Sequence, residues 1–114
     1  MVEIRTKSQH KSELNYIIDQ TNELLAMLRS EGLRIAGAYL YGSYVTGAAH
    51  ADSDIDVAII SPDLTGDRVQ DWLRLTLTAI KLDTRFEVIG FRPEQFRDEH
   101  PLAWEIKQKG IRIT

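Results

Sequence analysis

A chain of 114 residues is long enough for one domain with its own hydrophobic core, so we expect residues 1–114 to form a single domain. Lys and Arg number 14 against 17 Asp and Glu, the net charge is −3, and no basic cluster occurs, which argues against direct binding of a nucleic-acid backbone. Cysteine is absent, which excludes disulfides and thiolate metal sites; with no signal peptide and no membrane-spanning run, the expected location is cytoplasmic.

The first third of the chain predicts a polar lead-in, a long amphipathic helix and a strand. Residues 1–11 are polar and mixed in charge, so we expect a frayed segment. Ser12 is the predicted N-cap of the helix and Gly32 its predicted end. Between them, one threonine and six apolar side chains recur at the three- and four-residue spacing of one helical face: Leu14, Ile17, Ile18, Thr21, Leu24, Leu25 and Leu28. The apolar run from Ile35 to Tyr41 has the length of a buried strand.

The middle of the chain predicts a second strand followed by a second helix. Residues 55–60 are an apolar run of strand length, and Pro62 breaks the chain after it. A helix is predicted from about Gly66 to Lys81. We expect its apolar stripe to pack on the sheet, with Trp72 in the core rather than stacked on a base. The stripe consists of Val69, Trp72, Leu73, Thr76, Leu77 and Ile80.

The last third predicts a third strand and a final helix. Residues 85–91 form the strand, and residues 92–96 begin a turn or short helix, because proline is tolerated in a first helical turn. Residues 101–109 are predicted to be helical, with Gly110 as the end. Residues 111–113 add a short extended piece. Helical and strand patterns therefore both occur in one short chain.

The connection between the first two strands joins a glycine-bearing turn to two carboxylates. Asp54 and Asp56 are two residues apart, so on a strand their side chains would share a face about 7 Å apart. Mg²⁺ is usually held by one or two carboxylates together with substrate phosphates. Gly42 and Ser43 follow a strand, where the N–H groups of a helix start favour a phosphate. The alternative interpretation is an ordinary loop in which Asp52 and Asp54 cap a turn. Asp56 does not fit that alternative, because an acid within an apolar strand is costly to bury unless an ion or a donor compensates it.

The chain carries a Gly-Ser pair that is followed, after ten residues, by an Asp-x-Asp motif: Gly42-Ser43 and Asp54-x-Asp56. This pattern resembles the signature of the polymerase β-like nucleotidyltransferase superfamily. The short chain resembles the minimal nucleotidyltransferase (MNT) branch of that superfamily, and the resemblance extends from about Ile35 to Ile89. It implies a polymerase β-like fold of the α+β class, in which helices pack on a small mixed β-sheet. It also implies a nucleotidyltransferase that uses ATP and two Mg²⁺ ions.

The resemblance assigns nucleotide binding to Gly42, Ser43 and Tyr44, which would hold the β- and γ-phosphates. Small members of the branch often carry an arginine directly after Gly-Ser, whereas this chain has a tyrosine. The triphosphate therefore loses a nearby cation. The sequence offers three replacements without placing them: Arg68, Lys81 and Arg85.

The resemblance also assigns catalysis and metal binding to three acids. Asp54 and Asp56 would bridge the two ions, and a third acid on the neighbouring strand would hold the metal on the acceptor side. Glu87 is the acid that this chain offers in its third predicted strand, where many small members carry aspartate. Asp83, just before that strand, is the alternative. We favour Glu87, because Asp83 is expected in a loop.

Minimal members that resemble this chain commonly pair with a HEPN-domain RNase toxin and act as antitoxins by transferring AMP to a tyrosine of that toxin. The chain ends soon after its third acid, so we expect the acceptor to dock from another molecule, and a homo- or hetero-oligomer is expected. Two other functions stay open. A binding module could neutralise a partner by contact alone, which the missing arginine favours, and an enzyme could modify a small molecule such as an aminoglycoside.

Overall fold

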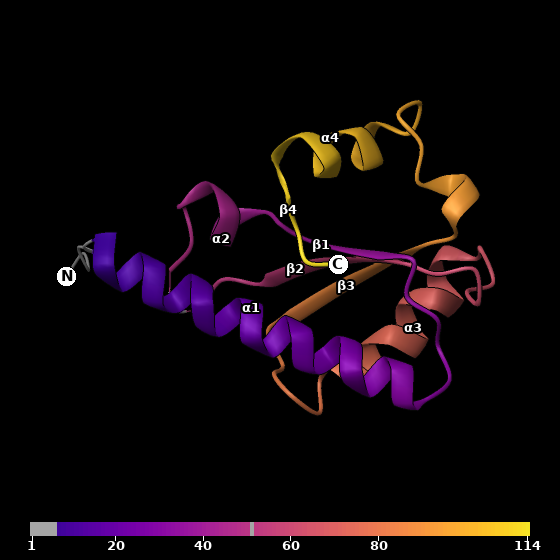
Figure 1. Ribbon diagram of the computed structural model, residues 1–114, viewed down its shortest axis with the longest axis horizontal. Helices are drawn as coiled ribbons and strands as arrows, with labels where there is room; N and C mark the ends of the chain where they lie inside the picture. Colours follow the sequence, from indigo (N-terminus) through magenta and orange to yellow (C-terminus); the bar gives the residue numbers. More distant parts are fainter. Residues whose placement is uncertain (1–6, 51) are drawn as a thin grey trace.

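A four-stranded sheet forms the centre of the computed structural model, which describes residues 7–50 and 52–114. The strand order is β3-β2-β1-β4; β1 pairs antiparallel with β2 and β4, and β2 pairs parallel with β3. Helices α1 and α3 lie on one face of the sheet and α4 on the other (Figure 1). The expected α+β fold with a small mixed sheet is confirmed. The elements are α1 (Lys7–Ser30), β1 (Gly37–Tyr41), α2 (Ser43–Thr46), β2 (Ile55–Ile60), α3 (Arg68–Ala79), β3 (Phe86–Phe91), the 3₁₀ turn η1 (Pro93–Gln95), α4 (Pro101–Lys109) and β4 (Ile111–Arg112).

The element boundaries differ from the prediction mainly at the start of the chain. Helix α1 begins at Lys7, so Ser12 lies inside the helix and is not its N-cap. Polar residues continue a helix readily where no core contact is required, which is why the apolar pattern alone placed the start too late. The remainder of the predicted lead-in, residues 1–6, lies outside the described residues. Although α1 has 24 residues, neither it nor another helix in the described ranges is apolar enough to cross a membrane.

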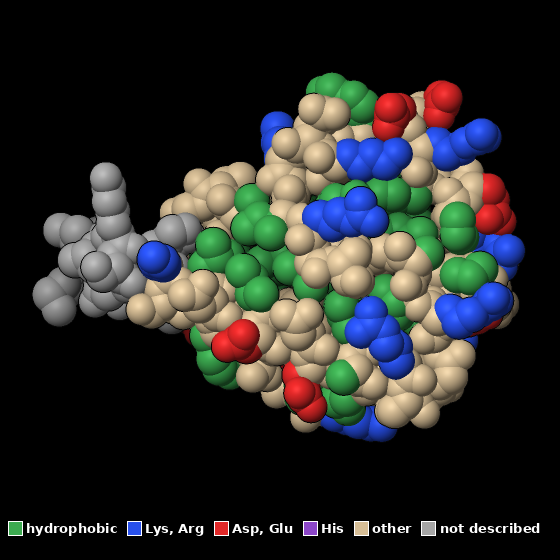
Figure 2. Space-filling model, viewed as in Figure 1, with side chains coloured by type: hydrophobic (Ala, Val, Ile, Leu, Met, Phe, Trp, Pro, Cys, Tyr) green, Lys and Arg blue, Asp and Glu red, His purple; other side chains and the backbone are tan. Residues whose placement is uncertain are grey.

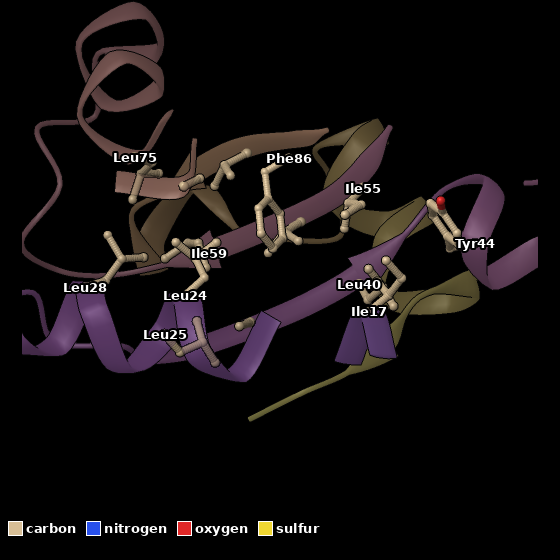
Figure 3. Close-up of a cluster of buried hydrophobic side chains, with 14 of the residues drawn as sticks. Ile17, Leu24, Leu25, Leu28, Leu40, Tyr44, Ile55, Ile59, Leu75 and Phe86 are labelled. Atoms are coloured by element: carbon tan, nitrogen blue, oxygen red, sulfur yellow. The ribbon is translucent and has the colours of Figure 1, made fainter. Parts of the chain in front are cut away.

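The larger part of the core lies between the sheet and helix α1 (Figure 3). Leu24, Leu25 and Leu28 of α1 are fully buried against it. Strand residues alternate between faces, so Leu40, Val57 and Val88 of three neighbouring strands point to the same side. Burying one such side chain contributes about 1.5–3 kcal/mol, so this face holds most of the apolar stabilisation.

Helix α3 packs on the sheet by a different face from the one predicted. Leu75 and Ala79 are buried, whereas Leu73 and Leu77 of the expected inward stripe are 50% and 54% exposed, so that prediction is wrong. Asp71 fixes the rotation of the helix. Its side chain is 2% exposed, and it accepts hydrogen bonds from the Thr65 hydroxyl and from the backbone N–H groups of Thr65 and Gly66 at 2.8 to 2.9 Å.

A small residue in β3 lets α3 approach the sheet. A Cβ added to Gly90 would lie 2.8 Å from Leu64 Cδ1 and 3.0 Å from Leu75 Cδ1. The glycine therefore leaves room for the buried face of α3. Together with the hydrogen bonds of Asp71, this close contact turns the more apolar face of the helix outward.

Substitution of two leucines in α3 tests its orientation. Leu75→Ala removes a fully buried side chain and is expected to lower the free energy of unfolding by about 3 kcal/mol. Leu77→Ala, the matched control, is expected to change it by less than about 0.5 kcal/mol, because this side chain is half exposed. Urea unfolding followed by circular dichroism measures both. A larger loss for Leu77→Ala than for Leu75→Ala would contradict the observed packing.

Candidate functional site

Three polar side chains form a row across neighbouring strands on the α4 face of the sheet. The register pairs Tyr41 of β1 with Asp56 of β2, and Asp56 with Glu87 of β3. By alternation these residues share a face with Ala58 and Ile60, which pack under α4 at the other end of the strands. The row lies beyond the buried cluster that includes Ala58 and Ile60, next to turn α2.

Negative charge is concentrated around Asp56. This half-buried carboxyl has its pKa raised to about 6, first by burial and then by the charges of Asp54 and Glu87. Asp54 is exposed and precedes β2, which begins at Ile55, so it lies at the end of the strand rather than within it. The three predicted acids are thus near enough to interact electrostatically.

The glycine of the Gly-Ser turn lies against the Asp56 carboxylate. Gly42 has a φ of 77°, and a Cβ added there would collide with Asp56 Oδ2 and lie 3.0 Å from the carboxyl carbon. A residue with a side chain cannot occupy this position without moving the acid. The turn therefore packs directly against Asp56, which together with Asp54 and Glu87 is called the acidic row.

Turn α2 carries the other predicted nucleotide-binding residues. The Gly42 carbonyl accepts hydrogen bonds from the N–H groups of Val45 and Thr46, both at 3.1 Å, which forms the first turn. Ser43 is partly buried at its start. Tyr44 points the other way: its ring is 2% exposed in the core (Figure 3), and its hydroxyl accepts a hydrogen bond from Arg85 Nη1 at 2.9 Å. Only the backbone of Tyr44 is therefore suited to a nucleotide at this turn.

The two candidates for the third acid have different surroundings. Asp83 forms an ion pair with Arg85, with Nη2 and Oδ2 2.8 Å apart, and this partner lowers the pKa of the Asp83 carboxyl. Glu87 is exposed and lies beside Asp56 in the register. The geometry therefore favours Glu87 as the member of the acidic row.

Of the three cations considered from the sequence, Arg68 lies next to the row. Arg68 is the first residue of α3. The pKa of Tyr41 is raised to about 12, chiefly by burial and then by the charges of Asp56 and Glu87, and the positive charge of Arg68 acts in the opposite direction. The guanidinium of Arg85 is bound to Asp83 and Tyr44, and Lys81 follows the C-terminal end of α3. Arg68 is therefore the cation best situated to meet a phosphate or another anion at this site.

A cavity of about 250 Å³ opens beside the acidic row. Trp72 forms part of its wall and is 42% exposed, so the prediction of a core position for this residue is wrong. Tyr41 is a site residue that was not predicted from the sequence, although antiparallel pairing of the two strands places it opposite Asp56. The cavity is lined by Tyr41, Arg68, Val69, Trp72, Glu87, Val88 and Ile89.

A second cavity, of about 390 Å³, lies on the other side of Tyr44, between α1 and α2. On the face of the molecule shown in Figure 2, hydrophobic side chains lie next to Lys and Arg side chains over the middle of the molecule. The lining of the second cavity includes Tyr16, Ile17, Tyr44 and Arg85, and none of the three acids. Although larger, it lacks the chemistry of the acidic row.

The acids of the row fit magnesium in donor type and charge. Carboxylate oxygens are the ligands that this hard cation prefers. A bound cation would oppose the burial and the charges of Asp54 and Glu87 that raise the pKa of Asp56. Among the described residues, no three acidic or histidine side chains are close enough to hold one ion together. A magnesium site needs only one or two carboxylates when substrate phosphates supply other ligands, so the residues present fit such a shared site.

The chain is similar in sequence to known nucleotidyltransferases. A family model described as polymerase beta, nucleotidyltransferase, matches residues 22–114. The protein adenylyltransferase MntA of Shewanella oneidensis is 32% identical over 71 residues, which cover 62% of this chain and 50% of that protein. The match thus spans about half the length of this relative. The family match covers the Gly-Ser and Asp-x-Asp motifs and agrees with the resemblance drawn from the sequence.

Solved structures share the fold. A putative nucleotidyltransferase from Sulfolobus solfataricus has a TM-score of 0.65 and 15% identity, covering 95% of this chain and 87% of that one. A toxin-antitoxin structure with AMP-PNP has a TM-score of 0.60 and 22% identity, covering 85% of this chain and 72% of that one. At these identities the likeness establishes the fold alone.

Two glycines with positive φ test the contact between the turn and the row. Gly42→Ala must displace the Asp56 carboxylate as well as strain the backbone, and is expected to lower the free energy of unfolding by about 2–4 kcal/mol. Gly47→Ala, with φ of 83° and open space around the added Cβ, should cost only about 1 kcal/mol. Urea unfolding compares them. Equal losses would show that Asp56 does not constrain position 42.

Proposed function

This chain belongs to the polymerase beta nucleotidyltransferase family, and we propose that it transfers AMP from ATP to a hydroxyl group on a partner protein toxin. The observation that carries the proposal is the acidic row beside the Gly-Ser turn. The Asp56 carboxylate lies so close to Gly42 that no Cβ fits at position 42, and its pKa is raised by burial and by the charges of Asp54 and Glu87. A family match alone would not distinguish an assembled site from a remnant of one.

The proposed reaction moves one adenylyl group. The acceptor oxygen forms a bond to the α-phosphorus, the bond from that phosphorus to the bridging oxygen of the β-phosphate breaks, and pyrophosphate leaves. The hydroxyl proton passes to a carboxylate of the row. Two Mg²⁺ ions, when bound, would neutralise the phosphates and make the acceptor hydroxyl more acidic.

Each residue of the site has a role in this proposal. Asp54 and Asp56 would hold the ions together with the phosphates, and the backbone at Gly42 and Ser43 would bind the β- and γ-phosphates. Glu87 faces the 250 Å³ cavity, so it is the carboxylate nearest an incoming acceptor and the one proposed to hold the acceptor-side ion and take the proton. Arg68 would supply the positive charge that an arginine after Gly-Ser supplies in related chains.

A toxin partner is supported by the relatives. One similar protein is named a protein adenylyltransferase, and two structural neighbours are described as toxin-antitoxin structures, one of them with AMP-PNP. We propose a HEPN-domain toxin as the partner and a tyrosine as the acceptor. A phenolic hydroxyl is a chemically suitable acceptor, because its ordinary pKa of about 10 makes it easier to deprotonate than serine or threonine.

Neutralisation by contact alone is a second candidate function. One observation favours it: the side chain that follows Gly-Ser is a buried tyrosine rather than a cation. This alternative needs a binding surface but no chemistry. It is separated from the first by measuring transfer and binding on the same samples.

Transfer is tested with α-labelled ATP, magnesium and a purified HEPN-domain toxin. Label is expected on the toxin with the wild-type chain, and Asp56→Asn or Glu87→Gln is expected to lower the initial rate at least ~100-fold, which corresponds to about 2.7 kcal/mol in the barrier. Asp52→Asn and Glu105→Gln are matched controls, because both residues are exposed and lie outside the row. Both controls should retain the wild-type rate.

Contact neutralisation predicts a different result in the same assay. The toxin would bind and lose its activity without acquiring label, and the Asp56→Asn chain would neutralise as well as the wild type. That pair of results would contradict the transferase proposal.

A further inference from the structure

Helix α3 presents an apolar surface to solvent. Val69, Trp72, Leu73, Leu77 and Ile80, called here the outer face of α3, are all exposed, from 42% for Trp72 to 71% for Val69. Val69, Leu73, Leu77 and Ile80 recur at three- and four-residue spacing and point away from the buried Leu75, and Trp72 lies at the border between this face and the buried one. Single exposed apolar residues are ordinary, but a contiguous row of large ones marks an interaction surface.

The outer face is continuous with the cavity of the acidic row. Val69 and Trp72 belong to both, and they line the cavity together with Glu87. Leu73 and Leu77 extend the same surface along the helix, outside the cavity. A molecule that lies along α3 therefore reaches the acid proposed for the acceptor side.

Away from Glu87, the exposed charged side chains on and just after α3 are positive. Arg68, Arg74 and Lys81 are exposed on or next to α3, although the chain as a whole has a net charge of −3. The acids of this segment are engaged: Asp67 caps the helix by accepting from two backbone N–H groups, and Asp71 is buried. These positive charges are thus complementary to acidic side chains on a partner.

We propose that the outer face of α3 is the docking surface for the protein that carries the acceptor hydroxyl. This inference rests on the proposed transfer activity and adds the place where the acceptor protein binds. The partner is expected to present an apolar patch bordered by Asp or Glu, with its hydroxyl at the end of the patch nearest Trp72. Apolar burial supplies the binding energy, and the acidic border sets the register.

A second copy of the chain fits this surface less well. Two copies that paired through their outer faces would each cover Val69 and Trp72 of the other, which form a wall of the cavity. Such a dimer would obstruct the acceptor side of both sites. An acceptor protein uses the same apolar surface and brings its hydroxyl to the cavity instead of closing it.

The test replaces Leu73 or Leu77 by aspartate, because both lie on the outer face but outside the cavity. Trp104→Asp on α4 is the control, since Trp104 is 49% exposed on the other side of the sheet. Binding of purified HEPN-domain toxin is measured by calorimetry, oligomeric state by analytical ultracentrifugation, and nucleotide binding by the thermal shift with AMP-PNP and magnesium. Circular dichroism verifies the fold of each variant.

Leu73→Asp and Leu77→Asp are expected to weaken toxin binding at least ~10-fold while the thermal shift with AMP-PNP stays at the wild-type value. In transfer assays the KM for the toxin should rise with kcat little changed. Trp104→Asp should bind like the wild type. The proposal is supported if the toxin binds in this pattern even when no label is transferred, in which case only the proposed activity fails.

Three results would overturn the docking proposal. The first is wild-type affinity in both α3 variants. The second is a wild-type chain that does not bind the toxin. The third is a wild-type chain that sediments as a dimer and becomes a monomer on Leu77→Asp, which would assign the outer face to a second copy.

Discussion

The close approach of the Gly42 backbone to the Asp56 carboxylate is the contact on which the site depends. It joins the end of β1 to the start of β2, and no side chain fits between them. Gly42, with its positive φ, also begins turn α2. The backbone proposed to bind phosphate and the carboxylate proposed to bind metal therefore lie at the same corner of the sheet. Glu87 joins this corner only because β3 pairs in parallel with β2 and brings its second residue beside Asp56.

This arrangement carries an electrostatic cost in the isolated chain. The folded chain retains the Asp56 proton up to a pH of about 6, whereas an unfolded chain releases it near pH 4. The folded state therefore binds more protons at Asp56 between these values, and the contribution of Asp56 to stability falls as the pH rises from about 4 to about 6 and is not regained above. A half-buried carboxyl next to two other acids lowers the stability of the folded chain, and such a cluster is typical of a site that holds a cation.

The sequence predicted those features that depend on local pattern. Strand length and alternation located β2 and β3, and the two-residue spacing of the acids with the Gly-Ser turn indicated the family. The resemblance to that family, and not the spacing itself, suggested Glu87 as the third acid. The rotation of α3 was not predictable in this way. Its most apolar face turns outward because Asp71 is held by the Thr65-Gly66 backbone and because Gly90 leaves room for Leu75. The first contact buries a carboxylate, which a hydrophobic pattern does not predict, and the second joins the helix to a later strand. The same rotation carries Trp72 from an expected core position to the wall of the cavity.

The most direct measurement of the central claim is the pKa of the Asp56 carboxyl, followed by NMR on ¹³C-labelled aspartate and assigned with the Asp56→Asn variant. In the absence of divalent ions the titration midpoint should be about 6. Addition of magnesium with AMP-PNP should lower it by at least about one unit, because a bound cation favours the ionised form. A midpoint near 4 that magnesium does not move would contradict an acidic row built to hold a cation.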